Sequence, residues 1–347
     1  MKDIRDLSFP ELVQYFESIG EKPFRAQQVF DWLYHKGLRD FHDMKNLPAP
    51  LKERLAKDFQ IFQPEILKEL VSEDGTAKVL FGLHDGQKVE TVLIPAMERS
   101  TVCVSTQAGC KFGCRFCASG IGGWKRNLAP SEILNQILHM RTVALAASPV
   151  GRELKPLSNI VFMGVGEPLD NYDNLLKTLR IINAPEGLNI GARKITISTC
   201  GVIPKIQALA KEGLQIELAI SLHGFNNDSR NVLMPVNRKY PFDDLIQACR
   251  EFFKATKRQI TFEYILIKGV TCTDEAAKEL SKYLKGMVCK MNLIPYNPVK
   301  EFDHKPPSRE EAFRFRRHLE SHGIHATIRM PRGRDVSAAC GQLRHAS

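Results

Sequence analysis

The sequence predicts an α/β fold, in which a partial (β/α)6 barrel follows a small helical domain and a β-hairpin linker. Three observations predict it. The chain has 347 residues, which is too long for one small module, and 43% of them are hydrophobic, which is enough for a large core. Its first sixty residues repeat apolar side chains at helical spacing. From residue 99 onward, short apolar strands alternate with amphipathic helices, the pattern of a parallel sheet.

Residues 1–60 are expected to form the helical domain. Ser8 can cap a helix, and Glu11 three residues later completes a capping box. Apolar residues then recur at positions 12, 15, 16 and 19, and again at 26, 29, 30 and 33. A third helix is expected to begin near Pro48. No catalytic residue is visible here, and RNA binding is its expected role only through the resemblance described below.

Residues 61–98 are expected to form the linker. Strands are predicted over 66–71, 78–83 and 88–94. Asp74-Gly75 and Asp85-Gly86 lie between them, and both pairs are typical of hairpin turns.

Residues 99–347 are expected to form the barrel and a C-terminal tail. Six strands are predicted at 101–105, 159–163, 194–198, 216–222, 259–267 and 288–294. Helices between them include 131–145, 172–182 and 242–255, and a late strand at 325–330 precedes the tail. Such repeats imply a parallel sheet closed or partly closed as a barrel, with a doubly wound open sheet as the alternative.

The charge favours a polyanionic partner. Lysine and arginine number 49 against 39 acidic residues, a formal net charge of +10, which is typical of nucleic-acid-binding proteins. No apolar run approaches the roughly 20 residues that span a bilayer, and the first residues lack a signal peptide. We therefore expect a cytoplasmic protein without a membrane partner, whose nine cysteines form no structural disulfide framework.

The strongest chemical signal is a three-cysteine loop directly after the first barrel strand. Cys110, Cys114 and Cys117 have the spacing C-x3-C-x2-C. A 4Fe–4S cluster normally takes four thiolates. Three would leave one iron open to bind and activate a substrate. The alternative is zinc, which normally needs four protein ligands in paired spacings, and no second pair follows here.

Polar residues also follow successive predicted strands, where a parallel barrel gathers its ligands. Glycine allows close backbone approach, and the polar side chains can hydrogen-bond a ligand. The pattern suits a pocket for S-adenosylmethionine. Its candidate binding residues are Gly166, Glu167, Ser198, Ser221, Leu222, His223 and Asn297.

These motifs together resemble the RlmN/Cfr family of dual-specificity RNA methyltransferases, and the cysteine loop resembles the radical S-adenosylmethionine (radical SAM) signature. The other matching positions are Glu90 in Val-Glu-Thr-Val, Cys103 in Cys-Val-Ser, Met163-Gly-Val-Gly-Glu-Pro, Ser221-Leu-His and Ala339-Cys340-Gly-Gln. The resemblance covers essentially the whole chain and implies a radical SAM barrel. Cys200 departs from the expected pattern by adding a thiol near the pocket.

The resemblance implies a radical methylation that consumes two S-adenosylmethionine molecules per turnover. Cys340 would first be methylated. A 5′-deoxyadenosyl radical would then remove hydrogen from that methyl group, and the carbon radical would add to adenine. Cys103 would release the product and form a transient disulfide with Cys340, while Glu90 would remove the ring proton. Read without the family, Cys103 could be an inert buried thiol, Cys340 a tail residue and Glu90 a surface carboxylate.

The implied substrates are adenosine 2503 of 23S rRNA and adenosine 37 of tRNAs, both methylated at C2, with a flavodoxin-like electron donor. The alternatives are Cfr-type methylation at C8, a zinc-held RNA-binding module and a radical enzyme for a small molecule. Basic residues near the site are expected to contact RNA, whose adenine must leave its stack. They are Lys111, Arg115, Lys125, Arg126, Arg329, Arg332 and Arg334, with a further group at Arg250, Lys254, Lys257 and Arg258.

Overall fold

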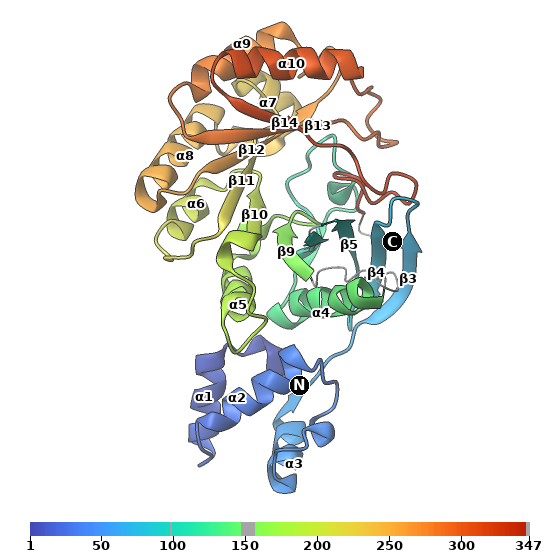
Figure 1. The fold of residues 1–347 in the computed structure, drawn as a ribbon, viewed down its shortest axis with the longest axis vertical. Coiled ribbons are helices and arrows are strands. Elements are labelled where there is room, and N and C mark those ends of the chain that lie inside the picture. The colour runs from blue at the N-terminus through green and yellow to red at the C-terminus, as the bar shows by residue number, and fades with distance from the viewer. Residues whose placement is uncertain (98, 147–156, 345–347) are drawn as a thin grey trace.

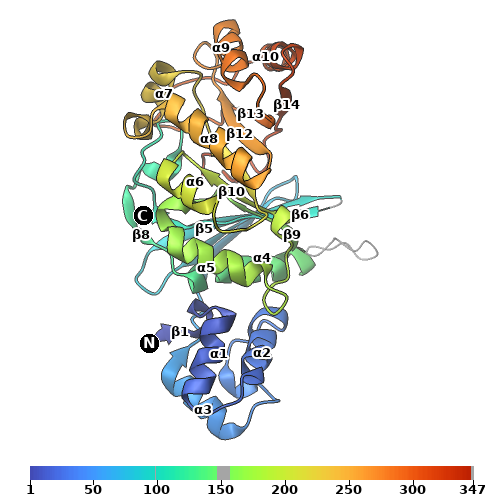
Figure 2. The same ribbon diagram turned by 90° about the vertical axis from the view of Figure 1, so that its left-hand side faces the viewer.

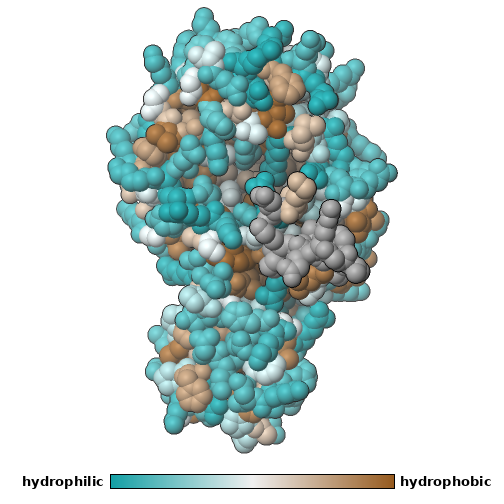
Figure 3. All heavy atoms as spheres, in the orientation of Figure 1, coloured by the Kyte–Doolittle hydropathy of each residue, from teal (hydrophilic) through white to brown (hydrophobic). Residues whose placement is uncertain are grey.

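The computed structural model describes residues 1–97, 99–146 and 157–344, which form a helical lobe joined to a large sheet-based lobe (Figure 1). The predicted boundary at residue 98 lies outside the described residues. In Figure 3 the helical lobe at the bottom joins the larger lobe through a narrower waist, and the face shown is mostly hydrophilic. No helix among the described residues has the length and apolar character needed to cross a membrane.

The helical lobe contains the three predicted helices, α1 (Phe9–Ser18), α2 (Phe24–Phe30) and α3 (Ala49–Asp58). Ser8 and Glu11 form the predicted capping box at the start of α1. α2 continues into a π-helical turn, Asp31–His35, and two short strands, β1 (Lys2–Asp3) and β2 (Phe59–Gln60), pair in parallel. Of the apolar residues predicted at helical spacing for α1, Leu12 and Phe16 are fully buried, whereas Tyr15 and Ile19 are partly buried.

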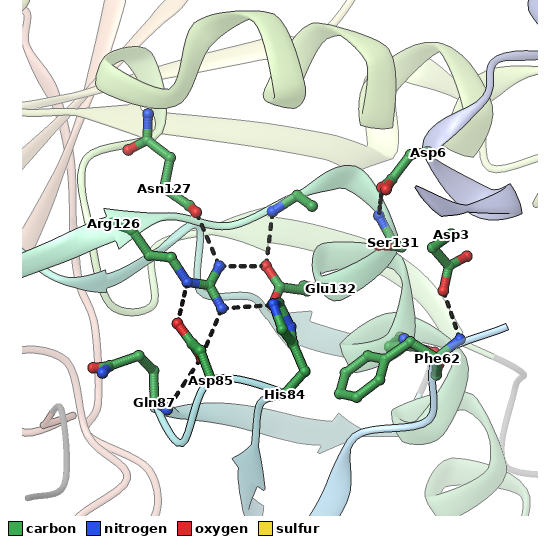
Figure 4. Close-up of polar contacts among 12 residues, drawn as sticks. Asp3, Asp6, Phe62, His84, Asp85, Gln87, Arg126, Asn127, Ser131 and Glu132 are labelled. Atoms are coloured by element: carbon green, nitrogen blue, oxygen red, sulfur yellow. Dashed lines mark hydrogen bonds and ion pairs between the residues drawn. The ribbon is translucent and has the colours of Figure 1, made fainter. Parts of the chain in front are cut away.

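Hydrogen bonds fix this lobe to the barrel. The Asp6 carboxylate accepts a 2.9 Å bond from the Ser131 amide at the start of α4 (Pro130–Ala146). Lys177 on α5 (Tyr172–Asn183) forms a 2.8 Å ion pair with Glu11. Figure 4 shows the Asp6–Ser131 bond beside the one from the Phe62 amide to Asp3.

The large lobe is built on a ten-stranded sheet in which seven consecutive strands are parallel. The strand order follows the sequence without reversal, so the doubly wound alternative is wrong. The outermost strands of the sheet, β14 and β3, are not paired with each other, which leaves the barrel partial. The parallel strands are β6 (Arg99–Cys103), β9 (Leu157–Phe162), β10 (Ile195–Thr199), β11 (Glu217–Ser221), β12 (Ile260–Leu266), β13 (Cys289–Pro295) and β14 (His325–Ile328).

Helices follow the first six parallel strands in turn and confirm the predicted (β/α)6 arrangement. They cover the outer face of the sheet (Figures 1 and 2). After α4 and α5 come α6 (Ile203–Leu209), α8 (Phe242–Thr256), α9 (Asp274–Leu284) and α10 (Arg309–Ser321), with α7 (Asn227–Leu233) between β11 and α8.

The strands predicted for the linker belong to the same sheet. β3 (Glu65–Val71), β4 (Ala77–Gly82) and β5 (Lys88–Ala96) are antiparallel, and β5 pairs with β6. They therefore extend the barrel wall beyond its first parallel strand. Their turns, around Asp74-Gly75 and Asp85-Gly86, occur where predicted, and both glycines have positive φ.

A second hairpin, which the sequence did not reveal, encloses the cysteine loop. It consists of β7 (Gln107–Gly109) and β8 (Trp124–Asn127). Arg126 joins it to the rest of the lobe through ion pairs with Asp85 at 2.6 Å and Glu132 at 2.7 Å (Figure 4). The guanidinium of Arg126, which was predicted to contact RNA, is thus occupied by ion pairs within the protein.

Candidate active site

One cavity brings together nine of the predicted site residues. It lies at the carboxyl ends of the parallel strands, where a barrel of this class places its ligands. The turn after β9 is fixed by Gln107 on β7, whose Oε1 accepts a 2.8 Å hydrogen bond from the Glu167 amide. The nine lining residues are Cys110, Cys114, Cys117, Gly166, Glu167, Ser198, Ser221, His223 and Cys340.

Local backbone geometry fixes the cysteine loop. β7 ends at Gly109, whose φ is +77°, and a Cβ there would lie 1.8 Å from the carbonyl oxygen of Gly123. Only glycine fits this position. Within the loop the Cys117 amide donates to the Cys114 carbonyl at 3.1 Å, which folds the two cysteines toward each other.

The donor set fits an iron–sulfur cluster. Burial raises the pKa of Cys110 to about 12 and also raises the pKa of Cys114 and Cys117, so metal binding must displace their protons. Among the described residues, no three Cys, His, Asp or Glu side chains converge as single-ion ligands. Each thiolate of a 4Fe–4S cluster binds a different iron, so three cysteines around one cavity suit such a cluster.

Glu167 orders the turn beside these thiols. Its two carboxylate oxygens accept the Leu169 amide at 3.0 Å and the Cys200 amide at 2.7 Å. Gly166 has φ +106°, and a Cβ there would clash with Gln107 at 2.6 Å. Cys200, the unexpected thiol, also lines the cavity, and its carbonyl accepts a 2.5 Å bond from Arg230. Its main chain therefore joins Glu167 to a buried guanidinium.

Ser198, Ser221 and His223 lie on neighbouring strand ends. The two serine hydroxyls are 3.3 Å apart. His223 Nδ1 accepts the Ile265 amide at 3.1 Å, so it ties the end of β11 to β12 and leaves the proton on Nε2. Burial, aided by the charge of Arg230, lowers the pKa of His223 to about 3 and keeps it neutral.

The C-terminal tail lines part of the cavity with Cys340 and Gly341. The Ala118 amide donates to the Gly341 carbonyl at 2.7 Å, and the Ser119 hydroxyl donates to the Leu343 carbonyl at 2.8 Å. Asn297, predicted to bind the cofactor, instead donates to the Cys340 carbonyl at 3.1 Å and lines an adjoining second cavity that also contains Cys340. The tail is thereby seated against the cysteine loop.

Cys103 lies beside this tail. It ends β6 and packs in a small buried cluster with Val92, Val165, Ala338 and Leu343. Burial is the main cause that raises the pKa of Cys103 to about 12, and the neighbouring Cys340 thiol is a second, smaller cause. The fold therefore brings together two cysteines that are far apart in sequence.

Glu90 lines neither cavity and holds the end of the tail instead. Its carboxylate receives Lys78 Nζ at 2.9 Å and the Arg344 amide at 2.8 Å. Lys78 also donates to the Ser337 carbonyl at 3.1 Å. Glu90 is 8% exposed, so the surface alternative for this residue is wrong.

The turn between β3 and β4 holds the start of the tail. Asp74 accepts the Gly333 amide at 3.0 Å, and the Ser72 hydroxyl donates to Asp335 at 2.6 Å. Because these partners lie about 260 positions apart, only the folded chain reveals that the predicted linker clamps the tail.

The side chain of Leu222, predicted to bind the cofactor, lies in the hydrophobic core rather than in either cavity. Its amide donates to the Glu263 carbonyl at 3.0 Å. Conversely, the sequence reasoning missed Glu263 on β12, which lines both cavities. A charged residue within a buried parallel strand was the signal that could have found it.

Several predicted RNA contacts are engaged within the protein. Lys111 pairs with Asp170 at 2.6 Å, and Arg258 pairs with Glu217. Arg334 donates to Asn297 at 3.1 Å. Lys125 on β8 is exposed beside the cysteine loop and is available to a polyanion.

Comparison with known proteins agrees with this geometry. Family models match the radical SAM superfamily over residues 104–282 and the ribosomal RNA large subunit methyltransferase N-terminal domain over residues 2–61. Two relatives are each called a probable dual-specificity RNA methyltransferase RlmN. That of Clostridium perfringens is 45% identical, covering 99% of this chain and 97% of its own, and that of Geobacillus kaustophilus is 47% identical, covering 99% and 93%.

A crystal structure of a radical SAM methyltransferase from Sphaerobacter thermophilus has a TM-score of 0.94 at 43% identity, with full coverage of both chains. The likeness thus extends over both lobes and the tail, as the sequence resemblance implied. The chain belongs to the RlmN family of dual-specificity RNA methyltransferases, within the radical SAM superfamily.

Proposed function

We propose that this enzyme methylates C2 of adenosine 2503 in 23S rRNA and of adenosine 37 in tRNAs, through an S-methylated Cys340. The observation that carries the proposal is the meeting of the tail residue Cys340 with Cys110, Cys114 and Cys117 around one cavity. The RlmN name of the relatives supports an RNA substrate and favours C2 over C8. Such substrates would place the activity in the cytoplasm.

The three cysteines of the loop would hold a 4Fe–4S cluster. Gly166, Glu167, Ser198, Ser221 and His223 would bind S-adenosylmethionine beside it. When bound, these groups supply a methyl cation equivalent from one S-adenosylmethionine and a 5′-deoxyadenosyl radical from a second. A small electron-transfer protein such as a flavodoxin would deliver the electrons.

The chain's own residues would carry the rest of the reaction. Cys340 accepts a methyl group on sulfur and carries its carbon to the adenine. Cys103 attacks the Cys340 sulfur and loses its thiol proton, so that a disulfide forms and the sulfur–carbon bond breaks. The carbon leaves with the bonding electron pair and takes up a proton, which makes it the methyl group of the product. Glu90 takes the proton from the ring carbon. The carboxylate of Glu90 accepts a hydrogen bond from the Arg344 amide. This proposal requires that hydrogen bond to open before Glu90 can approach the adenine.

The test is an anaerobic reaction of the cluster-loaded enzyme with reductant, S-adenosylmethionine and unmodified 23S rRNA or tRNA. Nucleoside mass spectrometry then compares the products with 2-methyladenosine and 8-methyladenosine standards. We expect 2-methyladenosine. An 8-methyladenosine peak, or the absence of both from an enzyme with a full cluster, would refute the proposed substrate chemistry.

A further inference from the structure

Glu263 places a carboxyl group on the inner wall of the barrel that the proposed reaction does not use. Thr261, Glu263 and Ile265 alternate along β12 toward the cavities. Glu263 is in register with Ser221 on β11 and Asn292 on β13. Its position is therefore level with a predicted S-adenosylmethionine residue but one strand further around the barrel.

This carboxyl group is only half satisfied. Glu263 is 3% exposed, and its Oε1 accepts a 2.9 Å bond from the Asn292 side chain. Its Oε2 is buried and has no hydrogen-bond partner among the described residues. Leaving a buried carboxylate oxygen without a hydrogen-bond partner destabilises the fold, because the oxygen has lost its water and gained no donor. A hydrogen-bond donor on a bound ligand would satisfy this oxygen.

Arg329 supplies a positive charge to the same space. It lines both cavities with Glu263 and Cys340, and its guanidinium has a 3.9 Å contact with the Met163 sulfur. Within the described chain, Arg329 and Glu263 form no ion pair with each other. Burial raises the pKa of Glu263, and the charge of Arg329 and the hydrogen bond from Asn292 offset part of that rise.

The second cavity indicates which ligand this acceptor meets. Glu263 and Cys340 line both cavities, whereas Glu167, Ser198 and His223 line only the first. Glu263 thus lies at the junction between the proposed cofactor pocket and the space on the other side of Cys340. A base presented to Cys340 for methylation would occupy that junction.

We propose that Glu263 Oε2 accepts a hydrogen bond from the N6 amino group of the target adenine and so selects adenine among purines. The inference rests on the proposed function and names a specificity residue for it. Adenine carries an N6 donor at this edge, whereas guanine and hypoxanthine carry an O6 acceptor that a carboxylate repels. Adenine of S-adenosylmethionine has the same amino group, so the test must separate the two sources.

The experiment compares RNA hairpins that carry adenosine or inosine at the target position, since inosine keeps a C2 hydrogen. Wild-type enzyme should prefer adenosine in kcat/KM and in equilibrium affinity measured by fluorescence anisotropy. In Glu263→Gln, the oxygen of the new glutamine amide should keep the hydrogen bond from Asn292. Its NH2 group should then face the base in place of Oε2. The adenosine-to-inosine ratio should therefore fall by roughly tenfold to a hundredfold. An unchanged ratio in both measurements would overturn the proposal.

Three controls make the outcome specific. Glu217→Gln removes another carboxylate of the second cavity, one already paired with Arg258, and should leave the ratio unchanged. Glu263→Asp keeps a carboxylate and should keep the preference; a ratio as low as that of Glu263→Gln would overturn it. Methylation of Cys340 without RNA should show an unchanged KM for S-adenosylmethionine in Glu263→Gln, and a raised KM would assign the contact to the cofactor instead.

The same design separates the failure of this proposal from failure of the proposed function. If wild type methylates neither hairpin, C2 methylation of this target is refuted. The affinity ratio still decides whether Glu263 reads N6. If wild type methylates adenosine but Glu263→Gln discriminates equally well, only the role of Glu263 fails.

Discussion

The main-chain amide of Arg344 donates a 2.8 Å hydrogen bond to the carboxylate of Glu90, a residue 254 positions earlier in the chain. Lys78 binds the other oxygen of that carboxylate and also the Ser337 carbonyl. Cys340 lies between the two tail residues held in this way. The proposed base thus holds the loop that carries the proposed methyl acceptor.

Replacing Lys78 by methionine should loosen the tail. The paired Lys78 and Glu90 side chains are only 11% and 10% exposed, and breaking a buried ion pair costs roughly 3–5 kcal/mol. Hydrogen exchange over residues 333–344 should accelerate, and methylation of Cys340 should slow. Lys68→Met, at an exposed position on β3, is the matched control. Equal exchange in both variants would show that the ion pair does not hold the tail.

Replacing Cys110, Cys114 or Cys117 by alanine should abolish the broad iron–sulfur absorbance near roughly 400 nm, because each thiolate holds a separate iron. Cys272→Ala, outside both cavities, should retain it. Iron and sulfide content after anaerobic reconstitution provide the measurement. A full cluster in any of the three loop variants would remove that cysteine from the ligand set.

Cys103→Ala should trap a covalent RNA–protein adduct. The carbon bridge from Cys340 to the adenine could form, but no thiol would be placed to release it. Denaturing gel electrophoresis detects the adduct as RNA-dependent protein of increased mass. Cys340→Ala is the control and should give a full cluster, no methylated protein and no adduct. Free methylated RNA at the normal rate from Cys103→Ala would contradict its role.

His223 should make stability depend on pH. Its pKa lies near 3 in the fold against 6.5 when unfolded, so between these values the unfolded chain binds the extra proton. Stability therefore falls as pH drops below 6.5, by about 1.4 kcal/mol from pH 7.5 to 5.5.

Urea unfolding at the two pH values measures this loss. His223→Asn should show a smaller loss, since asparagine tolerates the positive φ of 51° and has no proton to gain. An identical pH dependence in the variant would show that another group causes it.

Lys125 and Arg126 are neighbouring cations with different expected roles. Lys125→Met should weaken RNA binding and reduce the salt dependence by about one phosphate contact. Arg126→Met should instead lower thermal stability, because Asp85 and Glu132 lose their shared partner. Anisotropy titrations across salt concentrations, with melting curves beside them, separate the two effects. A reversed pattern would reassign the RNA contact to Arg126.

The periodic elements and the local motifs could be predicted from the amino-acid sequence. The 3.6-residue spacing in α1, the hairpin turns at Asp74-Gly75 and Asp85-Gly86 and the cysteine loop depend on neighbours a few positions away. Alternating strands and helices were likewise enough to predict a (β/α)6 sheet, because short connections leave few topologies open.

Features that rest on contacts between distant parts of the chain became visible in the folded structure. The approach of Cys103 to Cys340, the clamp of the tail by Asp74 and Lys78, and the burial of Glu90 and Glu263 all depend on residues from distant parts of the chain. A residue's own type and spacing do not reveal whether it faces solvent or a cavity, as Leu222 and Arg126 demonstrate. The physical reason is that exposure, hydrogen-bond satisfaction and charge pairing are set by whichever groups the folded chain brings within a few ångströms.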